Sequence, residues 1–330
     1  MPHVLRHCFL GLVASCLLLT SCDKKSEADP SIAGIAVANP DFSTLENAAV
    51  RGGVVEVLTN KNPDDPAGNF TVFAPNNAAF SRLGLNTADD LNSLQKDFLT
   101  STLLYHVANG TLAAPNLLPN STSASAFKGV TRRIINRGGY LYVNGSRILL
   151  TDVKASNGTI HIIDKVLLAT NADIVQSAVA LASAQVFVQP ELTYLVEAVL
   201  YCDLAPALTA TPGSAPLTVY APTDQAFKNL LAQLLGRPST SPADIRLLPK
   251  ATVTAVLLNH VVAGGKFTSE LPEGGTNTSL GGGTLTFGAF TNGTLPVRST
   301  GNGTATANMV IPDVQCTNGV VHVIDKVLLP

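Results

Sequence analysis

The sequence has no tryptophan, and aromatic residues make up only 5% of the chain. Few ring systems are therefore available as stacking platforms for nucleobases or sugars. Charged residues are also scarce, at 13% of the chain, and the formal net charge is −2. A chain with no excess of Lys and Arg has no positive field to hold a nucleic-acid backbone, so we expect no nucleic-acid partner.

The sequence also lacks the common catalytic motifs. It contains no Gly-x-Ser-x-Gly elbow, no Walker loop, no His-Glu-x-x-His and no Cys-x-x-Cys. Asp164 and Asp325 occupy equivalent places before a Lys, but no acid or base partner accompanies them. We interpret both as strand-end hydrogen-bonding residues, and we predict no enzyme activity, no catalytic residue and no cofactor.

Four histidines lie in the region expected to fold: His106, His161, His260 and His322. Two imidazoles per repeat make an incomplete zinc site, since zinc takes three or four protein ligands. No acidic cluster lies near them in the sequence. We therefore expect hydrogen-bonding histidines within apolar packing and no metal, with a metal site in each domain as the alternative.

Residues 1–21 are interpreted as a signal peptide. The apolar run from Cys8 to Thr20 is too short to cross a bilayer as a helix. It ends in Leu19-Thr20-Ser21-Cys22, which resembles the lipobox of bacterial lipoproteins. We predict that Cys22 becomes the lipid-bearing first residue, with an ordinary cleaved signal peptide as the alternative. Residues 22–38 would form a tether, and the protein would be anchored at the bacterial outer membrane, on the cell surface or the periplasmic face.

What the sequence does contain is an internal repeat. Thr71–Phe80 matches Thr218–Phe227 at six of ten positions, and Asn157–Leu168 matches Asn318–Leu329 at nine of twelve. A shorter block, Leu-Leu-x-His-Val, recurs between them. Two long copies in the same order indicate tandem domains rather than a solenoid. We assign residues 39–169 to the first domain and residues 172–330 to the second.

Each copy is predicted to be an α+β unit. Thr71–Ala74 and Thr218–Ala221 are short apolar strands that end at a proline. Asn76 and Thr223 then fit the N-cap position of a helix. The strand after each final Asn-Gly turn is apolar on both faces, which is typical of a strand buried on both sides.

The three repeated blocks, Thr-Val-Phe-Ala-Pro, Leu-Leu-x-His and Asn-Gly-x-x-His-x-Ile-Asp-x-Val-Leu-Leu, resemble the signature segments of the fasciclin domain. The resemblance covers nearly all of residues 39–330. It implies two fasciclin-like domains, each a seven-stranded β-sandwich wedge flanked by short helices. It also implies an extracellular or surface location and a role in adhesion or matrix binding.

The resemblance also suggests binding residues. In animal members of the family, a Tyr-His pair is implicated in integrin binding, and Tyr105-His106 matches it here, whereas the second copy keeps only His260. A second integrin-linked segment corresponds to the region of Pro312-Asp313. Since a bacterium has no integrin, these five residues are candidate binding residues for another ligand or structural positions.

Two features distinguish the second copy. Cys202 and Cys316 align with Gly52 and Ala155 of the first copy. Two cysteines gained in the same copy suggest neighbouring positions, so we predict a disulfide, with two buried free thiols as the alternative. A stretch rich in Gly, Thr and Asn, residues 274–308, is longer than its counterpart. We expect recognition to use this loop and other exposed surface, without a deep pocket, with a decorated hairpin that has no partner as the alternative.

We therefore predict a surface-anchored lipoprotein that binds or adheres and does not catalyse. Its expected partners are extracellular matrix, a cell-surface protein or a glycan, with the membrane reached through the lipid anchor. The alternative is an outer-membrane accessory protein that captures polysaccharide, for which Tyr140 and Tyr142 could supply a small aromatic platform.

Overall fold

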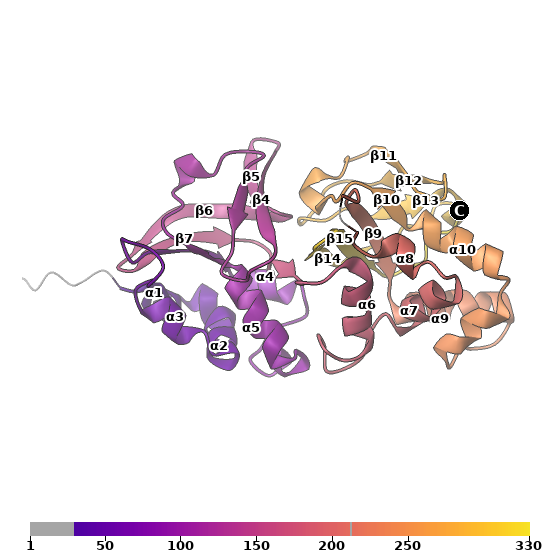
Figure 1. Ribbon diagram of the computed structural model, residues 1–330, viewed down its shortest axis with the longest axis horizontal. Coiled ribbons are helices and arrows are strands. Elements are labelled where there is room, and N and C mark those ends of the chain that lie inside the picture. The colour runs from indigo at the N-terminus through magenta and orange to yellow at the C-terminus, as the bar shows by residue number, and fades with distance from the viewer. Residues whose placement is uncertain (1–29, 212) are drawn as a thin grey trace, which may run out of the picture.

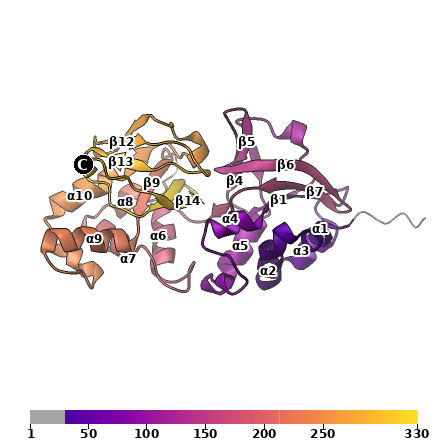
Figure 2. The same ribbon diagram turned by 180° about the vertical axis from the view of Figure 1, so that it is seen from behind.

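The computed structural model describes residues 30–211 and 213–330. The predicted signal peptide, Cys22 and residues 22–29 of the predicted tether lie outside the described residues, whereas residues 32–38 of that tether form helix α1 (Ile32–Ala38), whose Ile32 is buried in the core of the first domain. The chain forms two domains that lie side by side along the long axis of the molecule (Figure 1), and the view from behind shows the same arrangement (Figure 2). None of the described helices has the length and apolar character needed to cross a membrane.

The first domain has one seven-stranded sheet, in the order β2-β1-β7-β6-β5-β4-β3, with its main helices gathered on one side (Figure 1). The helices are α1 (Ile32–Ala38), α2 (Ser43–Gly52), α3 (Val55–Thr59), α4 (Asn77–Ser81) and α5 (Lys96–Tyr105). The strands are β1 (Phe70–Pro75), β2 (Val107–Asn109), β3 (Thr122–Ala124), β4 (Thr131–Arg137), β5 (Tyr140–Val143), β6 (Ser146–Ala155) and β7 (Gly158–Ile163).

Strand β1 lies between two apolar cores, and all of its residues are buried. Because successive side chains of a strand point to opposite faces, Val72 and Ala74 pack in the core under the helices while Phe73 packs in the other. Strand β1 pairs parallel with β7 and antiparallel with β2. The doubly apolar sequence of β1 thus corresponds to a strand covered on both faces.

The second domain repeats these elements with its strands divided between two sheets. The helices are α6 (Ile174–Ala182), α7 (Thr193–Tyr201), α8 (Ala205–Leu208), α9 (Asp224–Leu235) and α10 (Lys250–Asn259). The strands are β9 (Leu217–Pro222), β10 (Val261–Ala263), β11 (Thr276–Thr278), β12 (Thr284–Phe287), β13 (Val297–Ser299), β14 (Met309–Cys316) and β15 (Gly319–Ile324). The predicted α+β fold, with seven strands and flanking helices in each of two domains, is confirmed for the described residues.

The predicted helix starts after the two prolines are also confirmed. The side chain of Asn76 accepts a hydrogen bond from the Ala79 amide at the start of α4, at 2.9 Å. The Thr223 hydroxyl accepts one from the Ala226 amide at the start of α9, at 3.1 Å. In both repeats the polar residue after the strand therefore satisfies a free amide of the first helical turn.

Residues 274–308 do not form the exposed recognition loop that we expected. They hold β11, β12 and β13, which make a three-stranded sheet. Leu285, Leu295 and Val297 are fully buried there and pack with Phe287 and Met309 in a separate core. Trimming this stretch would remove the interior of that core, so we expect a trimmed chain to be less stable.

The predicted disulfide is also wrong, since Cys202 and Cys316 are both buried free thiols. Cys202 lies at the C-terminal end of α7, with its Sγ 3.8 Å from the Lys250 carbonyl oxygen. Cys316 ends β14, with its Sγ 3.4 Å from the Ser177 hydroxyl on α6. The two thiols occupy different places in one apolar core, so the paired change between the repeats reflects packing at two sites.

Candidate functional site

The two domains are joined by a short strand that enters the second sheet. Strand β8 (Leu168–Ala169) runs parallel to β14, with Leu168 beside Val314 and Ala169 beside Gln315. The Thr170 amide donates the next hydrogen bond to the Gln315 carbonyl oxygen at 2.8 Å. Because backbone hydrogen bonds hold the connection onto the sheet, the domains cannot hinge here without breaking them.

A buried ion pair lies across the same junction. The Lys165 Nζ atom of the first domain is 2.6 Å from Asp313 Oδ2 of the second, and the Lys165 side chain is only 7% exposed. Nζ also donates to the Thr268 hydroxyl at 2.9 Å and to the Gly293 carbonyl oxygen at 2.7 Å. All three ammonium hydrogens therefore have acceptors in the second domain, which a buried charge requires.

Asp313 owes its position to a β-bulge in β14. Its φ of 65° lies in the left-handed region, which Asp adopts more readily than most residues. Its carboxylate accepts hydrogen bonds from the Thr268 amide at 2.6 Å and the Thr268 hydroxyl at 2.7 Å. Burial alone would raise the pKa of Asp313, but Lys165, His322 and the Thr268 amide together hold that pKa below its ordinary value.

The first domain contains the same arrangement, but its Asp has no ion pair among the residues that the structure describes. Asp152 has a φ of 59° and accepts from the Ala114 amide at 3.0 Å. The Asp152 and Asp313 amides both donate to the Nδ1 atom of a histidine, His161 and His322 respectively. Asp313, one of the predicted binding residues, therefore has the same structural role as Asp152 and in addition forms an ion pair with Lys165. Its neighbour Pro312 is partly buried.

Tyr105 is fully buried and reaches across the junction. Its hydroxyl donates to Gln315 Oε1 of the second domain at 2.5 Å and accepts from Asn144 Nδ2 at 2.9 Å. Burial raises the pKa of the Tyr105 phenol to about 12. Tyr105 therefore holds the domains together and presents no surface to an external ligand.

His106 and His260 are buried at equivalent places and make the same two contacts. The Nδ1 atom of His106 lies 2.8 Å from the Thr102 carbonyl oxygen, and its Nε2 accepts from the Leu167 amide at 2.9 Å. Burial lowers the pKa of each imidazole to about 4. The expectation of hydrogen-bonding histidines within apolar packing agrees with these contacts, and no group of three metal-ligating side chains occurs among the described residues.

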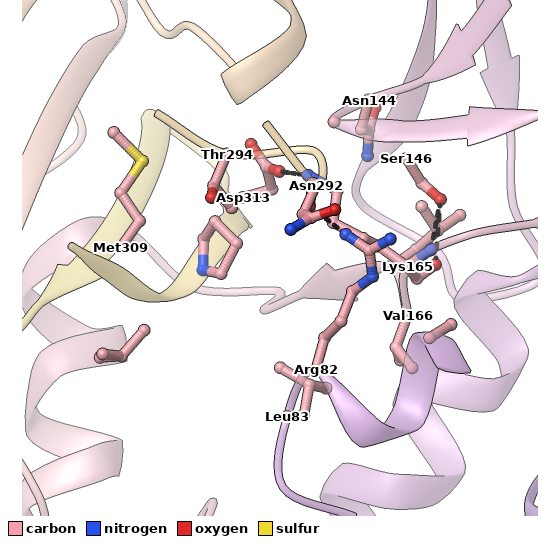
Figure 3. A pocket seen from close by; sticks show the side chains of 15 residues that line it. Arg82, Leu83, Asn144, Ser146, Lys165, Val166, Asn292, Thr294, Met309 and Asp313 are labelled. Carbon is pink, nitrogen blue, oxygen red and sulfur yellow. Dashed lines mark hydrogen bonds and ion pairs between the residues drawn. The ribbon is translucent and has the colours of Figure 1, made fainter. Parts of the chain in front are cut away.

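Beside the ion pair, the domains enclose a cavity of about 390 Å³. Figure 3 shows Arg82 reaching from the end of α4 toward Asn292, whose carbonyl oxygen it contacts. The residues that give the cavity its character are Arg82, Asn144, Lys165, Asn292, Met309 and Asp313. Our expectation of binding without a pocket did not anticipate this space between the domains.

The cavity walls are mainly apolar, with a few polar and charged side chains, and none of these lining side chains is paired for chemistry. Its Lys and Asp neutralise each other, and Asp164 nearby accepts from the Arg147 amide at 2.7 Å. Asp325 accepts from the Asn308 amide at 2.8 Å in the same way, so both have the predicted strand-end role. The arrangement can hold a small polar group or water, and it supplies no nucleophile paired with a base.

Of the predicted binding residues, only Pro312 and Asp313 line this cavity. Sequence reasoning missed Lys165, Arg82 and Asn144. Lys165 lies in a segment that is identical around Lys326, so nothing local marks it as an interface residue. Asn144 begins an Asn-Gly pair, a sequence signal of a tight hairpin turn, and that signal could have pointed to a rigid, contact-forming hairpin end.

Comparison with known proteins matches the fasciclin domain model to residues 40–169 and 190–330. A protein of Synechocystis sp., protein sll1483, is 36% identical over 139 residues, which is 42% of this chain and 73% of that protein. Immunogenic protein MPB70 of Mycobacterium bovis is 33% identical over 140 residues, covering 42% of this chain and 69% of MPB70.

A longer match runs through both domains. Transforming growth factor-beta-induced protein ig-h3 of Sus scrofa is 29% identical over 327 residues, covering 96% of this chain but only 44% of ig-h3. Among solved structures, a FAS1 domain pair from the insect cell adhesion molecule fasciclin I covers 90% of this chain and 95% of its own, with 16% identity and a TM-score of 0.40. Since the family model matches most of the chain in two consecutive copies, the protein is a member of the fasciclin domain family.

Proposed function

We propose that this protein is a non-catalytic binding protein that mediates adhesion at the bacterial surface and is anchored by lipid on Cys22. The observation that supports the proposal best is the rigid junction between the two domains. Strand β8, the Lys165–Asp313 pair and the Tyr105–Gln315 bond hold both domains as one body. Binding surfaces on a rigid pair keep their spacing, and this reduces the entropy lost when they engage a partner.

The chemistry of the described side chains supports binding over catalysis. The four histidines each accept or donate to backbone groups inside the fold, and the buried carboxylates hold loops and strand ends. Groups committed to the fold in this way are not available to a substrate. What remains for a partner is the outer surface and the hollows where the domains meet.

A second candidate function is capture of polysaccharide at the outer membrane. It is favoured by one observation, the position of Tyr140 and Tyr142 in a hollow at the domain junction. Matrix, a cell-surface protein and a glycan are all partners that an adhesion protein could use. The adhesive role does not depend on which of them is bound.

The adhesion proposal is tested by displaying the full chain on a non-adherent bacterial host and measuring retention on matrix-coated surfaces under flow. We expect retention with the native chain and its loss with Cys22→Ser, because one substitution removes the acyl anchor. Membrane fractionation and intact mass give the anchor a separate readout. Equal retention of the host with and without the protein would rule out adhesion.

A further inference from the structure

A second hollow lies where the β4–β5 hairpin of the first domain faces the second domain. We call it the arginine groove. It has a volume of about 770 Å³, and the residues that define it are Arg82, Arg137, Tyr140, Arg147, Phe290 and Asn292. In Figure 1, β4 and β5 lie on the side of the first domain that is turned toward the second. Both domains therefore contribute to the groove, and their rigid junction sets its width.

The charges in the groove do not balance. Arg137 pairs with Glu273 at 3.2 Å, and Arg82 lies 3.6 Å from Asp164. The guanidinium of Arg147 has neither an ion pair nor a hydrogen bond among the described residues, and its buried Nε lacks a partner. Three guanidinium groups thus face two carboxylates in a chain whose net charge is −2.

The Arg147 side chain lines the groove, and its guanidinium has no carboxylate or carbonyl acceptor among the described residues. The buried Nε is out of reach of a ligand, but the terminal nitrogens of a guanidinium can donate to a ligand that accepts hydrogen bonds and carries negative charge. The planar fork of Arg147 matches a carboxylate, which can accept two parallel hydrogen bonds. The positive excess of one charge suits a ligand that places one carboxylate against Arg147 within the groove.

The same groove offers aromatic faces next to the guanidinium groups. Tyr140 is 53% exposed, and the Arg147 Cζ atom lies 3.6 Å from the centre of its ring. On the opposite wall, Arg137 Cζ lies 4.1 Å from the centre of the Phe290 ring. Each guanidinium covers one face of its ring, so it is the remaining exposed part of Tyr140 that can contact the apolar C–H face of a sugar. The Arg147 guanidinium on the other side of the ring can bind an acidic substituent of that sugar.

The groove is less suited to an acidic peptide. Strands β4, β5 and β6 are all interior members of their sheet, so none offers a free edge for an added strand. The Asn292 side chain, which lines the groove, supplies a donor and an acceptor of the kind that sugar hydroxyls need. Aromatic rings, amides and guanidinium groups are the set expected for a charged carbohydrate.

We propose that the arginine groove binds a carboxylated polysaccharide, with Arg147 holding a carboxylate and Tyr140 covering a sugar ring. This inference rests on the proposed binding function and names the ligand class and its site. The carbohydrate chain would lie across both domains, so an intact junction is required for binding.

The test uses the full chain, purified in detergent, and two forms of one polymer. De-esterified polygalacturonate carries a carboxylate on each sugar, whereas its fully methyl-esterified form has the same backbone without the charge. We expect binding to the first form only, weakened at high salt. Arg147→Gln should weaken it about tenfold, as expected for one lost charge-assisted hydrogen bond. Tyr140→Ala should weaken it through loss of ring contact.

The matched control is Lys154→Gln, which removes the same charge from an exposed position on β6 outside the groove. Thermal melts show that each variant is folded. Equal affinity for both polymer forms, or equal affinity of Arg147→Gln and the native chain, would overturn the proposal. Polyglutamate binding as tightly as polygalacturonate, without any effect of Tyr140→Ala, would replace the glycan with an acidic protein.

Adhesion under flow separates this proposal from the broader function. If the displayed Arg147→Gln chain is retained like the native chain, and neither binds polygalacturonate, the ligand assignment is wrong and adhesion stands. If polygalacturonate binds but the host is not retained on any matrix, the ligand assignment for the arginine groove is correct and the adhesive function is wrong.

Discussion

The Nζ atom of Lys165 lies 2.6 Å from Asp313 Oδ2, although the two residues are 148 positions apart in the chain. Lys326, at the equivalent place in the second repeat, forms no ion pair among the described residues and is partly exposed. The same short sequence thus supplies an interdomain contact in one copy and a surface side chain in the other.

Lys165→Met should lower the free energy of unfolding by about 3–5 kcal/mol, because it leaves the carboxylate of Asp313 buried without its cation. Urea unfolding followed by circular dichroism measures the change. Lys326→Met is the matched control and should change stability by less than about 1 kcal/mol. Similar losses in both variants would show that the buried pair has no special role.

Stability should fall as the pH drops from about 6.5 to 4. His106 and His260 have pKa values of about 4 in the folded protein against 6.5 in the unfolded chain, so in this window the unfolded state binds more protons. The expected loss at pH 4 is about 3 kcal/mol for each histidine. Urea unfolding at a series of pH values checks it. The His106→Gln/His260→Gln variant should be less stable at pH 7 but lose less on acidification, and an unchanged slope would contradict the assignment.

Cys202 and Cys316 should remain reduced and unreactive in the folded protein. Both thiols are buried, and burial raises the pKa of Cys316, which lowers its thiolate fraction. A thiol reagent should label Cys202 and Cys316 only after the protein is unfolded. A reductant should leave the melting temperature unchanged. If oxidation gives a more stable protein in which neither thiol can be labelled, the two cysteines form a disulfide and this prediction is wrong.

Tyr105→Phe should lower the free energy of unfolding by about 1–3 kcal/mol, because Gln315 and Asn144 lose a buried partner. Tyr220→Phe is an informative control, since the Tyr220 hydroxyl is buried without a partner and Phe73 occupies the matching place in β1. That variant should be as stable as the native chain or more so.

The Tyr105 variant also tests the family-based interpretation of Tyr105-His106 as a binding motif. Retention under flow should be unchanged at temperatures where Tyr105→Phe is folded, because the side chain is fully buried. Loss of adhesion by a folded Tyr105→Phe protein would show that Tyr105 contributes to binding, contrary to this prediction.

The repeated blocks were sufficient to predict the fold of each domain. Strand β1 was recognisable because a short apolar run that ends at a proline is typical of a strand. Asn76 was recognisable as a helix cap because its side chain bonds to an amide three residues later. The strand-end roles of Asp164 and Asp325 followed from the absence of any partner in the sequence. The cap depends on neighbours a few residues away, which the sequence shows directly, whereas Asp164 and Asp325 each accept from an amide 17 positions earlier, which the sequence does not name.

Tertiary packing alone decided the rest. Lys165 and Lys326 share one local sequence, yet only Lys165 meets a carboxylate, because the first domain ends against the second. The same holds for Cys202 and Cys316, which share a core without touching, and for Leu285, whose burial depends on strands that residues 274–308 form with one another. The arginine groove combines side chains of both domains, so neither repeat encodes it alone. Periodicity records which face of an element is apolar, whereas contacts between distant residues depend on how complete elements pack.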